Sequence, residues 1–445
     1  MFLYADRRII LSGKPKMIKN KIFTNASWLI GCRIVQSVFS LLITMLTARI
    51  LGPADYGVIN YAASLVSFLV PVMQLGLNSI LVLELIKEPK KEGEILGSSL
   101  FMSFLSALLS ILGVTAFAFA ANGGNREITL ICALYSLLLI TQSFELIQYW
   151  FQAKYLSKYT AVATLCASIA VSLYKFFILL TTENLYLFAL SHAIDYLIIS
   201  AALIIIYRKK GGQRLSISFP RIRSLWKGGR YYIISGLMVT VFAQTDKIML
   251  KHMTGDAETG YYSAAFLCAG VTSFVFAAII DSARPSIFES LAKSEADFET
   301  GMTRLYSVVI YLSLLQSLCM TLLSGFIINL LYGSAYAPAA DALKLIVWYT
   351  TFSYMGAVRN IWIVAMEKQK YLWIINLSGA LTNIALNFFL IPIWGIMGAS
   401  LASLVTQMFT NVIIGFIIRP IIKNNALLFR GFDPRNILAL IKKTR

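Results

Sequence analysis

The chain has 445 residues, of which 58% are hydrophobic and only 13% are charged, and its mean hydropathy is +0.73. A water-soluble protein of this size cannot bury so much apolar surface, so most of the chain is expected to lie in lipid. The formal net charge of +18 would suggest nucleic acid as the partner of a soluble protein. A membrane topology explains the charge differently, as shown below, and no nucleic-acid partner is expected.

Apolar runs long enough to cross a hydrocarbon core of about 30 Å recur along the whole chain. They fall near 24–51, 57–86, 95–121, 127–151, 160–181, 185–207, 231–253, 260–283, 304–331, 340–365, 370–391 and 395–418. The first run is too long for a secretory signal core and has no small-x-small cleavage site, so it is expected to stay as helix 1. The sequence therefore predicts an all-α integral membrane protein with twelve transmembrane helices.

A basic segment divides these runs into two groups of six. We expect a basic cytoplasmic or interfacial N-terminus (1–22), an N-lobe of helices 1–6 (23–207), a basic cytoplasmic linker (208–230), a C-lobe of helices 7–12 (231–418) and a basic cytoplasmic tail (419–445). With an even number of helices, both lobes enter the membrane in the same direction. They are then related by a pseudo-twofold axis along the membrane normal.

The lysines and arginines follow the positive-inside rule. Most of them fall in the N-terminal segment, the linker, the tail and the other even-numbered connections between the expected helices. The odd-numbered connections keep mainly residues at helix ends, such as Arg49, Arg126 and Lys251. Because cytoplasmic loops of membrane proteins are enriched in basic residues, both termini are expected in the cytoplasm.

A short pattern at the turn between the first two expected helices returns in the second half of the chain. Its aligned residues are Gly52, Ala54, Asp55, Gly57 and Ala62 in the first half, and Gly255, Ala257, Glu258, Gly260 and Ala265 in the second. Glycine just past a helix, with proline behind it as at Gly52-Pro53, is a stop signal for the helix. The repeat indicates an internally duplicated membrane protein.

Polar residues recur at three- and four-residue spacing in several expected spans, which places them on one helix face. Examples are Gln142, Glu145, Gln148 and Gln152 in helix 4, Thr164, Ser168, Ser172 and Lys175 in helix 5, and Thr240, Gln244, Lys247 and Lys251 in helix 7. Such stripes are expected to face a water-filled cavity or one another. Hydrogen bonds between helices are the simpler interpretation for the uncharged residues.

Charged residues inside the spans are the stronger candidates for function, because an ionised group at the membrane midplane costs about 2.5–3.5 kcal/mol. We predict substrate binding by Arg33, Lys175, Lys247 and Arg359. Cavity polar residues that pair with them, or that couple transport to an ion, are predicted to be Glu145, His192, Asp195 and Asp246. Internal salt bridges are the alternative interpretation.

The cysteines and histidines indicate no metal site or disulfide. The five cysteines lie in apolar runs without paired spacing, and the two histidines are far apart in the chain. No cofactor is expected. No Ser/His/Asp grouping or phosphate-binding glycine loop is present, and every odd-numbered connection is short, which argues against a membrane polymerase or glycosyltransferase.

Three motifs together resemble the polysaccharide flippases of the multidrug/oligosaccharidyl-lipid/polysaccharide (MOP) exporter superfamily. They are Ala48-Arg49-Ile50-Leu51-Gly52-Pro53 with Tyr56-Gly57, the start of the second lobe at 245–250, and Asn387 to Pro392 with Gly395 to Ser400. The resemblance covers residues 20 to 420. It implies a V-shaped, alternating-access transporter with a cationic central cavity.

The resemblance also implies a substrate, an undecaprenyl-pyrophosphate-linked oligosaccharide such as an O-antigen repeat unit. It would be moved from the cytoplasmic to the periplasmic leaflet of a bacterial inner membrane. A coupling proton or sodium ion, membrane lipids and a loose association with polysaccharide polymerase and export proteins are the other expected partners, and the transporter is expected to be a monomer and not an enzyme. A drug or cation exporter of the same superfamily is the alternative. A membrane glycan polymerase is a second, weaker alternative.

Overall fold

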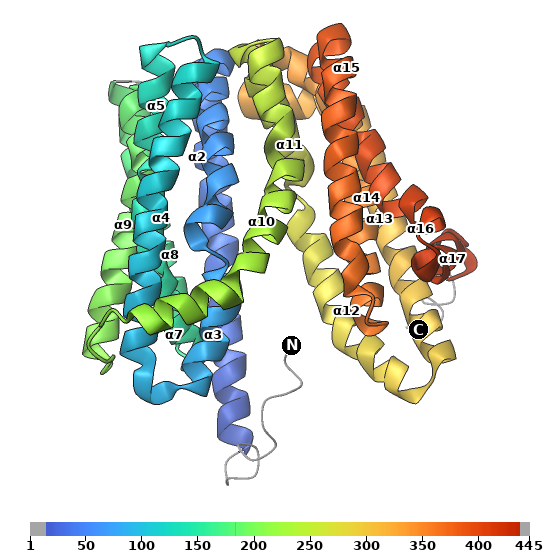
Figure 1. The fold of residues 1–445 in the computed structure, drawn as a ribbon. Coiled ribbons are helices and arrows are strands. Elements are labelled where there is room, and N and C mark those ends of the chain that lie inside the picture. Colours follow the sequence, from blue (N-terminus) through green and yellow to red (C-terminus); the bar gives the residue numbers. More distant parts are fainter. Residues whose placement is uncertain (1–14, 183, 437–445) are drawn as a thin grey trace. The chain divides into compact units, whose positions relative to one another are not determined.

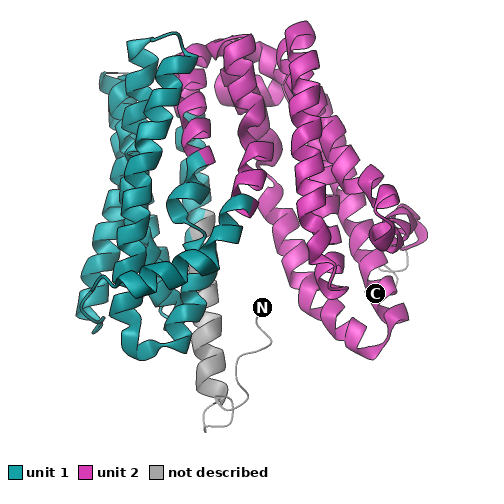
Figure 2. Ribbon diagram, viewed as in Figure 1, with its two compact units in different colours: residues 1–46, 69–234 teal, residues 47–68, 235–445 magenta. Residues whose placement is uncertain are grey.

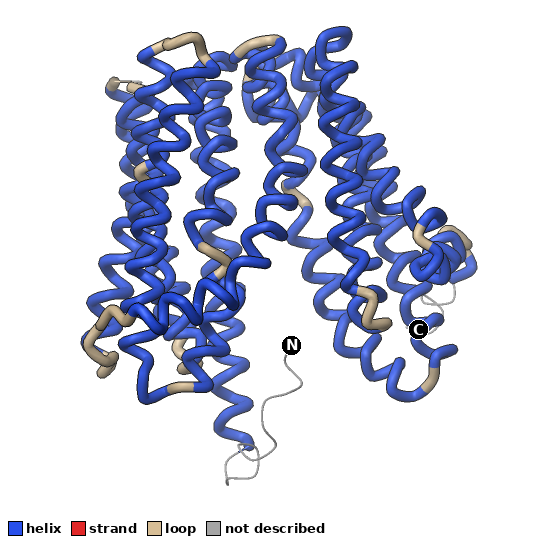
Figure 3. Tube along the Cα trace, in the orientation of Figure 1, coloured by secondary structure: helices blue, strands red, loops and turns tan. Residues whose placement is uncertain are grey.

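The computed structural model describes residues 15–182 and 184–436, with side chains described for 31, 32 and from 35 onward. Figure 3 shows that the described residues are helices joined by short connections, with no strand among them. The predicted all-α fold class is confirmed. Arg33 lies in the first helix, but its side chain falls outside the described part.

The chain forms two compact units, coloured separately in Figure 2. Unit 1 contains the residues up to 46 and 69–234, and unit 2 contains 47–68 and the residues from 235 onward. Two long helices, α2 (Pro15–Gln74) and α10 (Phe219–Met253), contribute to both units. The predicted lobe boundaries stay a prediction, since a unit and a membrane lobe need not coincide.

Unit 1 is built from helices that lie side by side in Figure 1. After α2 come α3 (Leu77–Lys87), η1 (Pro89–Lys91), α4 (Glu92–Ala121), α5 (Arg126–Ser136), α6 (Leu138–Ser143), η2 (Phe144–Ile147), α7 (Gln148–Ala153), α8 (Ser157–Thr181) and α9 (Leu185–Lys209). Their shared core includes Leu81, Trp150, Phe151, Leu203 and Tyr207. Asn125 and Asn184 cap α5 and α9 by accepting hydrogen bonds from backbone N–H groups of the first turn.

Unit 2 follows the same plan of long, closely packed helices. They are α11 (Asp256–Gly270), α12 (Ser273–Lys293), α13 (Glu295–Tyr332), η3 (Ser334–Tyr336), α14 (Ala337–Ala365), η4 (Gln369–Tyr371), α15 (Leu372–Met408), the π-helical turn η5 (Phe409–Ile413), α16 (Ile414–Ile417), η6 (Arg419–Ile421) and α17 (Ile422–Gly431). The predicted tail begins with a packed helix, because Leu427 and Leu428 of α17 belong to the core. Tyr306 also donates a hydrogen bond to Asn424 of α17 at 2.9 Å.

Nine helical stretches of the described chain are long and apolar enough to cross a membrane. The longest, Val35–Lys87, has 53 residues and would measure about 80 Å as one helix, far more than a bilayer core needs. Its helix is interrupted at Gly52, and the stretch Gln369–Ile417 is interrupted at Gly395. The protein is a multi-pass membrane protein, while the count of twelve helices stays a prediction.

The predicted repeat is visible in the backbone. Gly52 has φ 76° and ψ 173°, and its counterpart Gly255 has φ 112° and ψ −174°. Both glycines therefore adopt a conformation that side-chain-bearing residues avoid, and each separates two consecutive helices. Equivalent positions of the two halves therefore have the same type of backbone conformation, with positive φ and ψ near 180°.

A second pair of repeated glycines brings two helices of unit 2 into backbone contact. A Cβ atom added to Gly57 of α2 would overlap the carbonyl oxygen of Asp256, and one added to Gly260 of α11 would overlap the carbonyl oxygen of Pro53. The contact is thus reciprocal. Small residues of this kind let membrane helices approach closely, where van der Waals packing replaces the hydrophobic effect as the source of stability.

Tyr336 packs beside this contact. Its ring lies 6.3 Å from that of Tyr56 and 5.9 Å from that of Tyr261, both in edge-to-face geometry. Its hydroxyl donates to the carbonyl oxygen of Ala48 at 2.8 Å, so this fully buried phenol leaves no donor unused. Tyr336 therefore contacts Tyr56, which precedes Gly57, and Tyr261, which follows Gly260.

The predicted linker is ordered against unit 1 over much of its length. Gln213 donates to the carbonyl oxygen of Pro89 and accepts from the N–H of Gly93, and Ser216 donates its N–H to the carbonyl oxygen of Gly93. The linker then becomes helical at Phe219, the start of α10. The segment is a strap over the start of α4 and not a free loop.

An arginine fastens the beginning of α10 to the same unit. Arg221, only 9% exposed, donates two hydrogen bonds of 2.8 Å to the carboxylate of Glu88. Glu84 and Glu94 lie 3.6 and 3.8 Å from the same guanidinium. The hydrogen bonds from Arg221 lower the pKa of Glu88 to about 2, so this carboxylate stays ionised at neutral pH. The buried guanidinium is thereby matched by negative charge.

Replacing either repeated glycine by alanine is expected to destabilise the protein. Gly57→Ala or Gly260→Ala forces the two backbones apart and should lower the free energy of unfolding by about 1–3 kcal/mol, the usual cost of overpacking. Thermal unfolding of the purified protein in detergent measures the effect. Gly325→Ala is the matched control, because a Cβ there meets nothing within 4 Å. Equal stability of all three variants would contradict the reciprocal contact.

Candidate functional site

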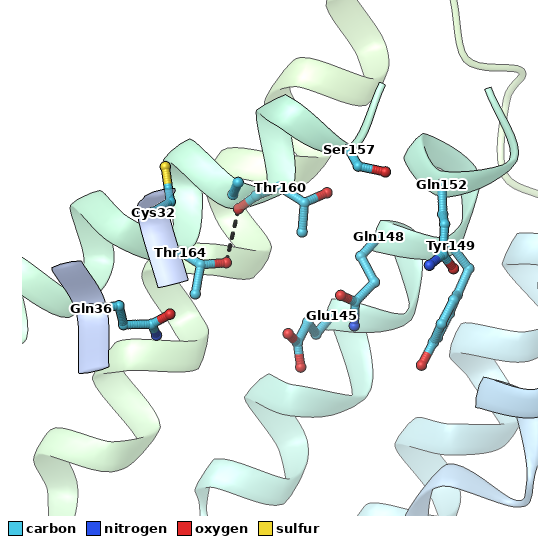
Figure 4. Close-up of a pocket in the computed structure, with 10 residues that line it drawn as sticks. Cys32, Gln36, Glu145, Gln148, Tyr149, Gln152, Ser157, Thr160 and Thr164 are labelled. Atoms are coloured by element: carbon cyan, nitrogen blue, oxygen red, sulfur yellow. Dashed lines mark hydrogen bonds between the residues drawn. The ribbon is translucent and has the colours of Figure 1, made fainter. Parts of the chain in front are cut away.

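A polar pocket of about 340 Å³ opens within unit 1 (Figure 4). Its lining residues come from four elements, α2, η2, α7 and α8. They are Cys32, Gln36, Glu145, Gln148, Tyr149, Gln152, Ser157, Thr160, Ala161 and Thr164. The lining is rich in carboxamide and hydroxyl groups, which both donate and accept hydrogen bonds. Its volume lies at the lower end of the range of small-molecule sites.

The polar stripe predicted in helix 4 forms one wall of this pocket. Glu145 lies in the 3₁₀ turn η2, and Gln148 and Gln152 follow in α7, so spacings of three and four residues bring them to one side. Figure 4 shows Glu145 and Gln148 next to each other, directed toward the space between their helix and α8. A 3₁₀ turn within a longer helical segment often marks a functional position.

The opposite wall of the pocket leaves hydrogen-bonding capacity unused. The Thr164 hydroxyl donates to the carbonyl oxygen of Thr160 at 2.8 Å, a bond drawn in Figure 4. The Thr160 hydroxyl itself is buried and has no hydrogen-bond partner among the described residues. A buried polar group without a partner is costly, so a ligand or water that reaches Thr160 gains a hydrogen bond.

A second polar cluster of unit 1 joins α8 to α9. The Nζ atom of Lys175 lies 3.3 Å from Nε2 of His192 and 5.1 Å from the ring centre of Phe188. The hydroxyl of Tyr135 lies 3.5 Å from Nδ1 of the same imidazole. One turn along α9, the Oδ1 atom of Asp195 is buried without a hydrogen-bond partner in the described structure. Three of the predicted site residues are therefore neighbours.

In unit 2, Asp246 is the centre of a buried hydrogen-bond network. Its Oδ2 atom accepts hydrogen bonds from the hydroxyls of Tyr262 and Ser403, each at 2.5 Å. Its Oδ1 atom accepts from the side-chain amide of Asn387, which also donates to Asn383. The side chain of Asp246 is 5% exposed. These three hydrogen-bond donors stabilise the carboxylate in its buried position.

The two predicted cations of unit 2 differ in environment. The Nζ atom of Lys247 lies 5.7 Å from the ring centre of Phe266, a cation–π contact. Arg359 of α14 is only 5% exposed and donates to the carbonyl oxygen of Thr410, in the π-helical turn η5. Its Nε atom has no hydrogen-bond partner among the described residues. Within that part of the chain, no group of three or more His, Cys, Asp or Glu could hold a metal ion.

Comparison with known proteins assigns the family. Residues 22–291, more than half of the chain, match the family described as "Polysaccharide biosynthesis protein". The chain belongs to this family. An uncharacterized membrane protein of Methanocaldococcus jannaschii is 24% identical over 419 residues, which cover 86% of this chain and 81% of that protein.

Two solved structures show the fold of this family member. The lipid II flippase MurJ in an inward closed conformation has a TM-score of 0.70 at 14% identity, covering 93% of this chain and 92% of its own. An inward-facing multidrug resistance MATE family transporter of the MOP superfamily has a TM-score of 0.65 at 12% identity, covering 88% of this chain and 95% of its own. The family match confirms the polysaccharide family that the motifs indicated, and the two structures show that the chain shares its fold with a lipid II flippase and with a transporter of the MOP superfamily.

The predicted site residues fall into separate groups. In unit 1, Lys175, His192 and Asp195 cluster, and Asp195 also interacts electrostatically with Glu145 on the pocket wall. Asp246 and Lys247 are adjacent in α10 but differ in their partners, as their neighbouring positions in a helix require. The roles assigned to these residues stay predictions, as does that of Arg33.

Six of the ten lining residues were not predicted from the sequence, among them Gln36, Thr160 and Tyr149. Gln36 follows Arg33 by three residues in α2, so helical periodicity counted from Arg33 could have found it. Thr160 lies one turn before Thr164, which the stripe of helix 5 did include. Tyr149 gave no signal, since one tyrosine among apolar residues is most often part of a core.

The Asp246 network makes a prediction about stability. Tyr262→Phe removes one donor from a buried carboxylate and should lower the free energy of unfolding by about 2 kcal/mol. Unfolding of the detergent-purified protein measures this change. The control is Tyr231→Phe, since Tyr231 is 67% exposed and its loss should change the free energy by less than about 0.5 kcal/mol. Equal effects of the two substitutions would show that the network does not stabilise the fold.

Proposed function

We propose that this chain is a flippase for an undecaprenyl-pyrophosphate-linked oligosaccharide, such as an O-antigen or similar repeat unit. It moves the substrate by alternating access from the cytoplasmic to the periplasmic leaflet of a bacterial inner membrane, with both termini in the cytoplasm. No covalent chemistry is required of the protein. The family of polysaccharide biosynthesis proteins supports the glycan, and a fold shared with a lipid II flippase supports the transport of a lipid-linked substrate.

The observation that carries this proposal is the polar pocket of unit 1. A membrane helix bundle gains nothing from an open space lined by amides and hydroxyls unless a polar molecule enters it. Sugars present many hydroxyls that such groups can pair with. A lipid-linked oligosaccharide needs such a polar surface while its sugars cross the bilayer.

The diphosphate requires positive charge and donors in addition. Arg33, Lys175, Lys247 and Arg359 are the proposed groups, because a phosphate taken from water into a protein interior needs compensating cations. Glu145, His192, Asp195 and Asp246 are the proposed polar partners for a coupling proton or sodium ion. The unpartnered Oδ1 atom of Asp195 supports such a role for that residue.

A drug or cation exporter is the second candidate. Glu145 on the pocket wall favours it, because a carboxylate attracts a positively charged substrate. The fold shared with a multidrug resistance transporter agrees with it equally. The two functions differ in what accumulates when the protein is absent, lipid-linked glycan in one case and a toxic cation in the other.

Removal of charge at Arg33 tests the flippase in cells. The chromosomal copy is deleted, and wild type, Arg33→Ala and Arg33→Lys are expressed at matched membrane levels. We expect the deletion to lose surface polysaccharide and to accumulate lipid-linked units in the cytoplasmic leaflet. Arg33→Ala should lower the rate of export about tenfold, the effect of losing one charged hydrogen bond, and Arg33→Lys should restore part of it.

The matched control is Arg126→Ala, at an exposed helix end. It should export as well as wild type. Normal surface glycan in a deletion strain without a second such transporter would contradict the flippase, and resistance to cationic drugs would then be measured next.

A further inference from the structure

The pocket of unit 1 has the composition of a sugar site. Three of its side chains are carboxamides (Gln36, Gln148 and Gln152), one is a carboxylate and three carry aliphatic hydroxyls. A carboxamide can donate to one hydroxyl and accept from its neighbour, and a carboxylate can accept from two adjacent hydroxyls. Vicinal hydroxyls on a sugar ring present this alternation of donors and acceptors.

Tyr149 adds an aromatic ring to the same wall. It lies one residue after Gln148 and lines the pocket with it. A tyrosine offers an apolar face together with a hydroxyl, which suits a ring that has C–H groups on its faces and hydroxyls at its edge. Small-molecule sites are built in this way, from apolar surface and a few placed polar groups.

The unused hydrogen-bonding capacity points to a ligand. The buried Thr160 hydroxyl lacks a partner among the described residues, although most of the side chains that line the pocket are polar. The Asp246 network of unit 2 shows the opposite case, in which both carboxylate oxygens of Asp246 are satisfied by neighbouring side chains. A hydroxyl that is left without a partner on the wall of a pocket, unlike the carboxylate oxygens of Asp246, suits an exchangeable occupant.

We propose that this pocket binds a hydroxyl-rich sugar ring of the lipid-linked substrate, while the diphosphate is held elsewhere by cations. The assignment rests on the proposed flippase function and divides its substrate between two sites. Gln148 and Glu145 recognise adjacent sugar hydroxyls, Thr160 contributes a third contact, and Tyr149 packs against the ring. Specificity for the glycan then depends on the amide wall, and affinity for the lipid carrier depends on the basic residues.

Binding of two related probes separates the two parts of the substrate. Full-length protein is purified into lipid nanodiscs and titrated with a prenyl diphosphate carrying one N-acetylglucosamine and with the terminal methyl ester of the same prenyl diphosphate, which has the same charge and no sugar. Wild type should bind the sugar-bearing probe about tenfold more tightly, the worth of one or two net hydrogen bonds. Gln148→Leu should abolish that difference and leave the affinity for the sugar-free probe unchanged.

Two controls make the result specific. Gln369→Leu, at a glutamine outside the pocket, should keep the wild-type preference for the sugar. Arg33→Ala should lower the affinity for both probes by the same factor, because Arg33 is proposed to bind the diphosphate. Misfolding cannot produce the expected Gln148→Leu result, since a misfolded protein would lose its affinity for both probes.

The outcomes also separate this assignment from the proposed function. If wild type binds the two probes equally while the deletion strain accumulates lipid-linked units, the sugar pocket is wrong and the flippase stands. If Gln148→Leu keeps the preference for sugar, the pocket is likewise wrong. If wild type prefers the sugar through Gln148 but the deletion strain exports glycan normally, the pocket stands and the flippase is wrong.

Discussion

The backbone contact between Gly57 and Gly260 is the constraint on which the rest of unit 2 depends. Apolar surface gains little from being buried in a bilayer that is itself apolar, so helices associate there by close packing. Because Gly57 and Gly260 have no side chain, the backbone of each helix can approach the other at this point. The non-helical conformations at Gly52 and Gly255 direct the helices into it, and Tyr336 fills the space beside it. A duplicated sequence thus becomes a physical interface between a segment from each half of the chain.

The pocket of unit 1 and the Asp246 cluster of unit 2 treat their polar groups differently, and this difference gives the functional argument its direction. In unit 2, Asp246 is surrounded by donors, and the network binds α10, α11 and α15 together. In unit 1, Thr160 and Asp195 retain buried atoms without partners in the described structure, and amides line an open pocket. Groups that satisfy one another stabilise a fold, whereas groups left open are available to a substrate or an ion. The strap fastened by Arg221 keeps the beginning of α10 fixed on unit 1.

Hydropathy, charge and the repeated glycines predicted the membrane fold, because span length and loop charge depend on local composition alone. The stripe at Glu145, Gln148 and Gln152 was also found, since helical periodicity brings such residues to one face. Tyr149 was missed, because nothing local separates a pocket tyrosine from a core one. The pairing of Lys175 with His192 and the donors around Asp246 could only be listed as alternatives. Which polar residues meet depends on helix rotation and register, and these follow from packing between distant segments.

Translocation by the purified chain alone tests the central claim most directly. The protein is reconstituted into liposomes that carry a fluorescent lipid-linked oligosaccharide in both leaflets, and a membrane-impermeant reagent quenches the label from outside. A flippase brings the inner-leaflet pool to the outer surface, so the account predicts quenching well beyond the half that protein-free liposomes allow. Quenching that stops at the same half, with folded protein present and any coupling gradient of protons or sodium supplied, would contradict it.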